Sequence, residues 1–173
     1  DEQMGTAPSS DTMHNSIFFT WECAATGDLL DYLKQTQTTA DPMILAGMDI
    51  QDSVYAGSID RASQFKALIA PLDSAYADSV AAMDQEYLDH QASMDYNTFL
   101  GWVAANGARL EDGYTQLSAW LDTNRTALEA ANPDRPLWPR LARQAAWSMS
   151  QEIAYLELPQ GTYATTTLRD AGM

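Results

Sequence analysis

The chain has 173 residues and a formal net charge of −15 at pH 7. Its first 95 residues hold 16 Asp and Glu against three Lys and Arg, whereas residues 96–173 hold eight against six. An electrostatic field of this sign repels nucleic-acid phosphates and anionic lipids, so we expect no nucleic-acid partner. The sequence has no run of about 18–20 apolar residues, so we also expect no direct insertion into a membrane.

The termini differ in character from the rest of the chain. Residues 1–10 are polar and small, which predicts a flexible arm. A polar, acidic start of this kind is typical of a mature chain after signal-peptide removal and predicts a periplasmic or extracellular location; an interior fragment is the alternative. Residues 11–158 are expected to form a single helical bundle domain, and the β-branched residues 159–173 a C-terminal extended tail.

Apolar residues at three- and four-residue spacing predict two helices in the first 70 residues. The first helix is expected over about 11–38, with a buried face that includes Ala25, Leu29 and Tyr32. The second is expected to begin at Asp41-Pro42, a helix cap followed by proline, and to end before Pro71.

Three more helices are expected in the remainder. The third is expected to start near Asp73 and to end before a break around 95–97. The fourth runs over about 98–131, with glycines at 101, 107 and 113 that bend it or admit a close neighbour. A proline-rich segment at 132–136 then separates it from the fifth helix, over about 139–156. The predicted fold class is therefore all-α, an antiparallel bundle of four to five helices.

Known catalytic motifs are not evident in the sequence. It has no G-x-S-x-G segment and no glycine-rich phosphate loop between a strand and a helix. The single cysteine excludes an internal disulfide framework and a cysteine-based zinc site. These observations predict that the chain is not an enzyme and has no cofactor.

Glu86 and His90 are weak candidates for metal ligands. They lie four residues apart and would share one face of a helix. A carboxylate site in a four-helix bundle requires Glu-x-x-His on two helices and further Glu residues, and the chain has only one near-match. We therefore expect His90 to be a seam residue that hydrogen-bonds to Glu86.

Arginine and tryptophan gather in the less charged half of the chain. Both residue types commonly anchor protein interfaces. They predict a partner-binding surface around residues 133–147, made by Arg135, Trp138, Arg140, Arg143 and Trp147. The alternatives are that the tryptophans are core residues and that the arginines pair with acidic helices of the same bundle.

Two segments carry a family resemblance. The stretch from Leu141 to Trp147, followed by Gln160-Gly161-Thr162 and Leu168-Arg169, resembles the C-terminal part of secreted bacterial lysozyme-inhibitor-like helical domains. The segment 72–76 is similar to a Leu-Asn-x-x-Tyr helix of that family. The resemblance implies a secreted helical domain and an acidic protein able to bind a cationic enzyme, and it assigns no functional residue.

Together these patterns favour a non-enzymatic helical binding or accessory protein outside the cytoplasm. It would dock on a protein partner as a subunit of a larger assembly or as an inhibitor, and oligomers are possible. A ligand-sensing four-helix bundle domain of a receptor is the alternative, and a metal-binding bundle is a third hypothesis. The first three helices would form an acidic, solvent-facing side and the last two the docking side.

Overall fold

The computed structural model describes residues 24–36, 38–39, 43 and 60–158. Within these ranges it contains six helices and no strand, which confirms the predicted all-α class. They fall into two compact units, the first holding α3 (Ala24–Thr36) and the second holding α4 to α8. The single domain expected over 11–158 spans both units. The expected arm at 1–10 and tail at 159–173 lie outside the described residues.

The helix α3 lies within the first predicted helix, but it buries a different face from the expected one. Leu30, Leu33 and Thr36 are buried, whereas Leu29 and Tyr32 are about half exposed. The sequence Leu-Leu-Asp-Tyr-Leu offers apolar residues on two adjacent faces, so helical spacing by itself did not decide between them.

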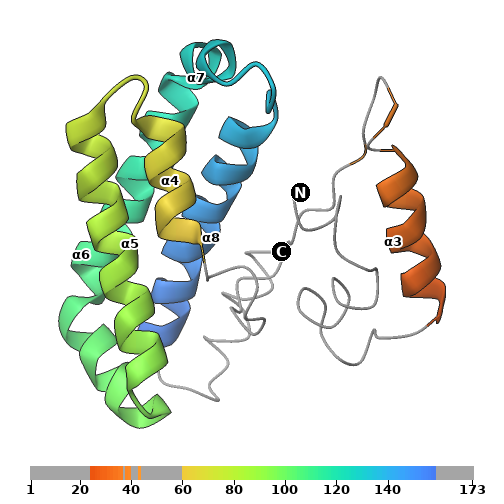
Figure 1. Ribbon diagram of the computed structural model, residues 1–173. Coiled ribbons are helices and arrows are strands. Elements are labelled where there is room, and N and C mark those ends of the chain that lie inside the picture. Colours follow the sequence, from red (N-terminus) through yellow and green to blue (C-terminus); the bar gives the residue numbers. More distant parts are fainter. Residues whose placement is uncertain (1–23, 37, 40–42, 44–59, 159–173) are drawn as a thin grey trace. The chain divides into compact units, whose positions relative to one another are not determined.

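The second unit is a bundle whose four main helices run alternately up and down (Figure 1). They are α4 (Arg61–Ile69), α5 (Ser74–Ser93), α6 (Tyr96–Thr123) and α8 (Trp138–Glu157). The short helix α7 (Arg125–Ala131) connects α6 to α8 at one end of the bundle. The predicted antiparallel bundle is thus confirmed for these helices. None of the described helices is both long and apolar enough to cross a membrane.

Both ends of α5 lie where the sequence predicts them. The Asp73 carboxylate accepts a hydrogen bond from the Tyr76 backbone N–H at 2.9 Å, which caps the helix N-terminus. The helix ends at Ser93, and α6 begins directly after Asp95, within the predicted break. Pro71 lies in the turn after α4, so the predicted end of the second helix is also confirmed.

The fourth predicted helix is not continuous. It is expected over 98–131, but α6 ends at Thr123 and α7 starts at Arg125. At the junction, Asn124 has backbone angles φ −97° and ψ 7°. Its backbone N–H and its side-chain Nδ2 both donate to the Trp120 carbonyl, at 3.0 and 2.9 Å. This side-chain bond offers the end of α6 an alternative to continued helix, which is how asparagine commonly stops one.

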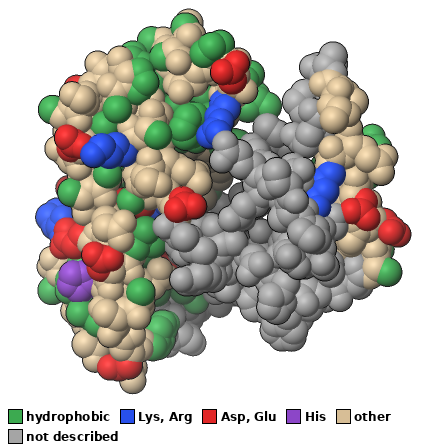
Figure 2. All heavy atoms as spheres, in the orientation of Figure 1, with side chains coloured by type: hydrophobic (Ala, Val, Ile, Leu, Met, Phe, Trp, Pro, Cys, Tyr) green, Lys and Arg blue, Asp and Glu red, His purple; other side chains and the backbone are tan. Residues whose placement is uncertain are grey.

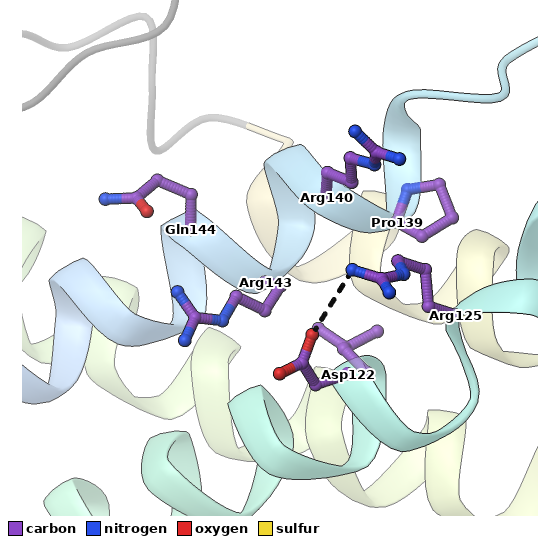
Figure 3. A pocket seen from close by; sticks show the side chains of 7 residues that line it. Asp122, Arg125, Pro139, Arg140, Arg143 and Gln144 are labelled. Atoms are coloured by element: carbon purple, nitrogen blue, oxygen red, sulfur yellow. Dashed lines mark ion pairs between the residues drawn. The ribbon is translucent and has the colours of Figure 1, made fainter.

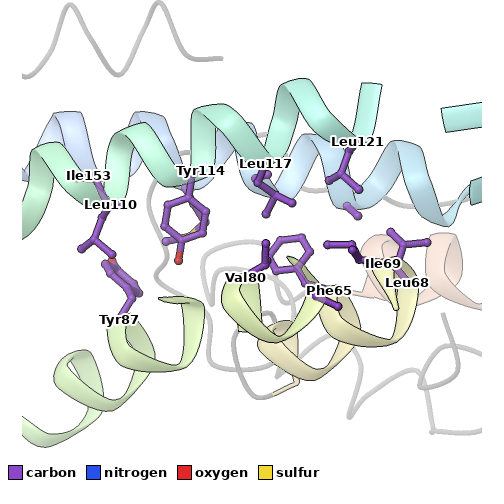
Figure 4. Packing of buried hydrophobic residues seen from close by; sticks show 14 of the residues in the cluster. Phe65, Leu68, Ile69, Val80, Tyr87, Leu110, Tyr114, Leu117, Leu121 and Ile153 are labelled. Carbon is purple, nitrogen blue, oxygen red and sulfur yellow. The ribbon is translucent and has the colours of Figure 1, made fainter. Parts of the chain in front are cut away.

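The core of the bundle is built mainly on one stripe of α6. Its steps of four and three residues place an apolar face along the whole helix toward the other helices (Figure 4). This spacing is readable in the sequence, and its residues on α6 are all buried: Phe99, Val103, Leu110, Tyr114, Leu117 and Leu121. Leu128, which continues the pattern, is buried on α7. On α8 the apolar spacing predicts a buried face through Leu141, Ala145, Met149, Ile153 and Leu156. Met149 and Ile153 are buried as predicted, whereas Leu141, Ala145 and Leu156 are only half-buried and Ala142 and Ala146 are buried as well.

The glycines of α6 differ in their surroundings. A Cβ atom at Gly107 would meet the Glu157 side chain of α8, and one at Gly113 would meet the Met83 sulfur of α5. Both positions therefore admit a close neighbour, as expected. Gly101 is exposed and has open space around it.

Replacement of Gly101 by alanine is expected to stabilise the second unit by about 0.5–1 kcal/mol. Alanine lowers the entropy of the unfolded chain and meets no neighbour at this position. Urea unfolding followed by tryptophan fluorescence measures the change, with Gly113→Ala as the comparison because it displaces Met83. A Gly101→Ala variant no more stable than the wild type would contradict the prediction.

The cap of α6 is expected to make stability depend on acid pH. Asp95 accepts hydrogen bonds from the Thr98 hydroxyl and from the backbone N–H groups of Thr98 and Asn97, which lower the pKa of its carboxyl. Because the folded pKa lies below the unfolded one, this stabilisation is complete above about pH 4, the unfolded value, and is lost as pH falls through the folded value. Unfolding of wild type and Asp95→Asn between pH 6 and 2.5 should show the smaller pH dependence in the variant.

Candidate functional site

A pocket of about 300 Å³ opens on the surface where α6, α7 and α8 meet. Figure 3 shows Arg125 of α7 reaching back toward Asp122 of α6, with Arg143 of α8 on the other side of that carboxylate. The pocket therefore brings together side chains from three helices. Its walls are formed by seven residues: Leu121, Asp122, Arg125, Pro139, Arg140, Arg143 and Gln144.

The ion pairs at this pocket are loose. Arg125 Nη1 lies 3.8 Å from the Asp122 carboxylate, and Arg140 Nε lies 3.6 Å from the Glu129 carboxylate. Both distances exceed that of a good N–H···O hydrogen bond, and the arginine side chains are about half or more exposed. Such pairs contribute about 0–1 kcal/mol each, so the guanidinium groups stay available to a ligand.

Four of the five residues predicted to bind a partner occupy neighbouring positions at this end of the bundle. The guanidinium of Arg135 lies over the Trp138 ring, 5.0 Å from its centroid. Arg140 and Arg143 line the pocket, while Trp147 is half-buried on α8 and is not among the lining residues. The structure thus brings four of the five residues into two adjoining groups.

The half-buried tryptophans contribute to packing as well. Trp102, Trp120 and Trp138 all pack against the core while keeping part of their surface exposed. The Trp120 ring lies 5.0 Å from that of Tyr76. Burial of the Tyr76 ring, with the nearby Asp73 carboxylate, raises the pKa of its hydroxyl.

A second polar cluster lies inside the bundle. The Asp84 side chain is fully buried and receives hydrogen bonds from Arg61 Nε at 2.9 Å and from the Tyr114 hydroxyl at 2.5 Å. The Arg61 guanidinium lies 5.8 Å from the centroid of the Tyr87 ring. The expectation that the acidic helices form a solvent-facing side is therefore wrong at Asp84. Charged groups of both signs also lie close together on the face shown in Figure 2.

The cluster is expected to make stability depend on alkaline pH. Burial, with the negative charge of Asp84, raises the pKa of Tyr114 well above its usual value of 10. Because the folded pKa exceeds the unfolded one, this contribution is complete below pH 10 and is lost as pH rises toward the folded value. Tyr114→Phe should unfold with a smaller loss of stability between pH 9 and 11 than the wild type, measured by urea titration at each pH.

Glu86 and His90 do not form a metal site in the structure. The Glu86 carboxylate pairs with Arg109 at 2.7 Å, and His90 Nδ1 contacts the Glu86 backbone carbonyl at 2.7 Å. The His90 ring stacks on Trp102 at 4.1 Å between centroids. The expected hydrogen bond to Glu86 is thus present, through the backbone. Across the described ranges, no group of three His, Cys, Asp or Glu side chains could hold a metal ion.

Sequence reasoning missed two important residues. Arg125 lies in the segment predicted as continuous helix, and no local pattern pointed to a pocket there. The burial of Asp84 could have been predicted from the sequence, because Asp84 lies four residues after Val80 and three before Tyr87 on an otherwise apolar face. A carboxylate at such a position indicates a buried partner on another helix.

Comparison with known proteins shows a similarity over part of the chain. No protein-family model matches the chain, and no solved structure matches it. A curated protein of Bacillus subtilis (strain 168), named "Putative hydrolase YbfO", is 35% identical to this chain over 57 residues. The match covers 33% of this chain and 13% of that protein, so the chain spans a small part of its relative's length.

This similarity corrects one prediction. The sequence predicts that the chain is not an enzyme, and a match to a protein named as a hydrolase contradicts that prediction. The resemblance to lysozyme-inhibitor-like domains stays a prediction, since neither the matched protein's name nor the fold bears on it.

Proposed function

We propose that the second unit is a binding domain that docks on an acidic protein surface through the exposed end formed by the α7–α8 connection. The observation that carries this proposal is the concentration of cations there. Four of the nine Lys and Arg residues of a chain with net charge −15 lie at this end: Arg125, Arg135, Arg140 and Arg143.

The chemistry of this surface suits a protein interface. Arg135 and Trp138 form a cation–π pair, and Leu137 between them is 36% exposed. Arginine and tryptophan recur as the residues that dominate interface energies, because each combines a large contact area with directed polar groups. Arg140, whose side chain is 63% exposed, extends the surface toward the pocket.

A photo-crosslinking residue at Leu137 tests this proposal. In native extract it should capture a partner, and the crosslinked peptide should be rich in Asp and Glu. The same residue at Ser79, an exposed position of α5, serves as the control and should capture nothing comparable. The Arg135→Glu substitution should abolish capture from position 137. Equal capture from both positions, or capture that persists in Arg135→Glu, would contradict the proposal.

The location of the protein can be tested separately. The periplasmic or extracellular location predicted from the sequence would be measured by fractionating cells that express the natural gene with a tag. The roles as an inhibitor, as a subunit or as a ligand-sensing domain are then distinguished by the identity of the captured partner.

A second candidate function is hydrolysis, favoured by the partial similarity to the protein named as a hydrolase. In this proposal the chain supplies a helical part of a larger hydrolytic enzyme. The test is an assay of the full natural gene product against panels of ester and amide substrates. Turnover by the full product that is lost when residues 60–158 are deleted would support a role for this unit, whereas retained turnover would contradict it.

A further inference from the structure

We propose that the pocket between α6, α7 and α8 binds a small phosphate monoester. This inference goes beyond the docking function, because it concerns a small ligand and rests on the pocket itself. The central groups are Arg125 and Arg143, which approach the pocket from two different helices.

The pocket has a local excess of positive charge. Arg125, Arg140 and Arg143 line it, and the nearby carboxylates are those of Asp122 and Glu129. Each carboxylate approaches one arginine, at 3.8 and 3.6 Å, and Arg143 forms no ion pair with any residue of the described ranges. One positive charge is therefore uncompensated in a chain that is acidic overall.

The loose ion pairs make the arginines available to an incoming anion. At 3.6–3.8 Å the guanidinium N–H groups are not engaged in short hydrogen bonds to carboxylates. A phosphate oxygen can approach to about 2.8 Å and accept two parallel bonds from one guanidinium. Such charge-assisted contacts are stronger than the pairs they would replace.

Several features favour a phosphate monoester over a carboxylate. A monoester carries close to two negative charges above pH 7, and its three terminal oxygens can be shared between several guanidinium groups. The Gln144 amide adds a neutral polar group to the lining. A volume of about 300 Å³ suits a small ligand.

Binding of phenyl phosphate, measured by isothermal titration calorimetry at pH 7.5, tests the proposal. The wild-type chain should show saturable binding at one site. Arg143→Gln and Arg125→Gln should each weaken it about tenfold, the effect of losing one charge-assisted contact. Arg109→Gln is the matched control, because Arg109 is a similarly exposed arginine that pairs with Glu86 away from the pocket, and it should bind as the wild type does.

Companion ligands and one cross-check complete the experiment. Inorganic phosphate should compete with phenyl phosphate, whereas benzoate should bind at least tenfold more weakly. Unchanged binding in both pocket variants, equally tight binding of benzoate, or no saturable binding to the wild type would each overturn the proposal. Arg135→Glu, which should abolish capture from position 137, should bind phenyl phosphate as the wild type does because Arg135 does not line the pocket. Failure of this inference is therefore distinguishable from failure of the docking function.

Discussion

Replacement of Asp84 by alanine is expected to lower the free energy of unfolding of the second unit by about 3–5 kcal/mol. The substitution removes the carboxylate from the Arg61 guanidinium, whose side chain is only 10% exposed, and takes the acceptor from the Tyr114 hydroxyl. A buried charge that loses its counter-ion keeps the full cost of its desolvation. Urea or guanidinium unfolding, followed by the fluorescence of the four tryptophans in this unit, measures the loss.

Asp78→Ala provides a matched control for this prediction. Asp78 also lies on α5 and also pairs with a cation of α4, Lys66, at 2.7 Å. The side chains of Lys66 and Asp78 are both more than half exposed, so this ion pair should contribute no more than about 1 kcal/mol to stability. If the two alanine variants were equally stable, the buried cluster would have no special role in holding α4 and α5 together.

A triple variant distinguishes two effects on the free energy of unfolding: the loss caused by breaking the Arg61–Asp84 pair, and the net contribution of the intact pair. Combining Arg61→Met, Asp84→Leu and Tyr114→Phe replaces every polar group of the cluster by an apolar one. Buried ion pairs are often replaceable in this way at little cost, so we expect a loss well below that of Asp84→Ala alone. A triple variant as unstable as the single one would show that the intact network itself is strongly stabilising.

The second large effect is expected at Leu117, where substitution by alanine should cost about 2–5 kcal/mol. Leu117 is fully buried on the central stripe of α6, in the cluster formed with Phe65 and Val80 of the neighbouring helices. Truncation removes three carbon atoms from close-packed surroundings and leaves a cavity that the helices fill only partly.

Leu72→Ala is the control for the core substitution. Leu72 lies in the turn between α4 and α5 and is 39% exposed, so its truncation should change stability by less than about 0.5 kcal/mol. Chemical unfolding of both variants measures the difference. Comparable losses at the two positions would mean that the α6 stripe is not the centre of the core.

Much of the helical architecture could be predicted from the chain by itself. Asp73 and Asp95 mark helix starts, Pro71 and the segment 132–136 mark interruptions, and the apolar stripe of α6 is buried throughout. These signals act within one or two helical turns. A cap bonds to backbone groups two or three residues away, and an apolar stripe repeats every three or four residues. Local chemistry is therefore enough to place them.

The candidate site could be predicted only in part. The sequence indicated Arg135, Trp138, Arg140 and Arg143 by their residue types, but it did not indicate that Arg125 would join them. That pocket depends on the break at Asn124, which lets α7 depart from the line of α6. The break depends on a competition between one side-chain hydrogen bond and continued helix, which residue spacing does not resolve.

The sequence by itself determined that this is an acidic helical protein with most of its helix boundaries at recognisable caps and prolines. Only the tertiary structure decided where the charges lie. Asp84 is buried because Arg61 and Tyr114, 23 residues before it and 30 after it, meet it inside the bundle. Three arginines form a pocket because packing brings α7 and α8 together. Such pairings arise from packing between helices, and packing acts over separations that local sequence patterns do not encode.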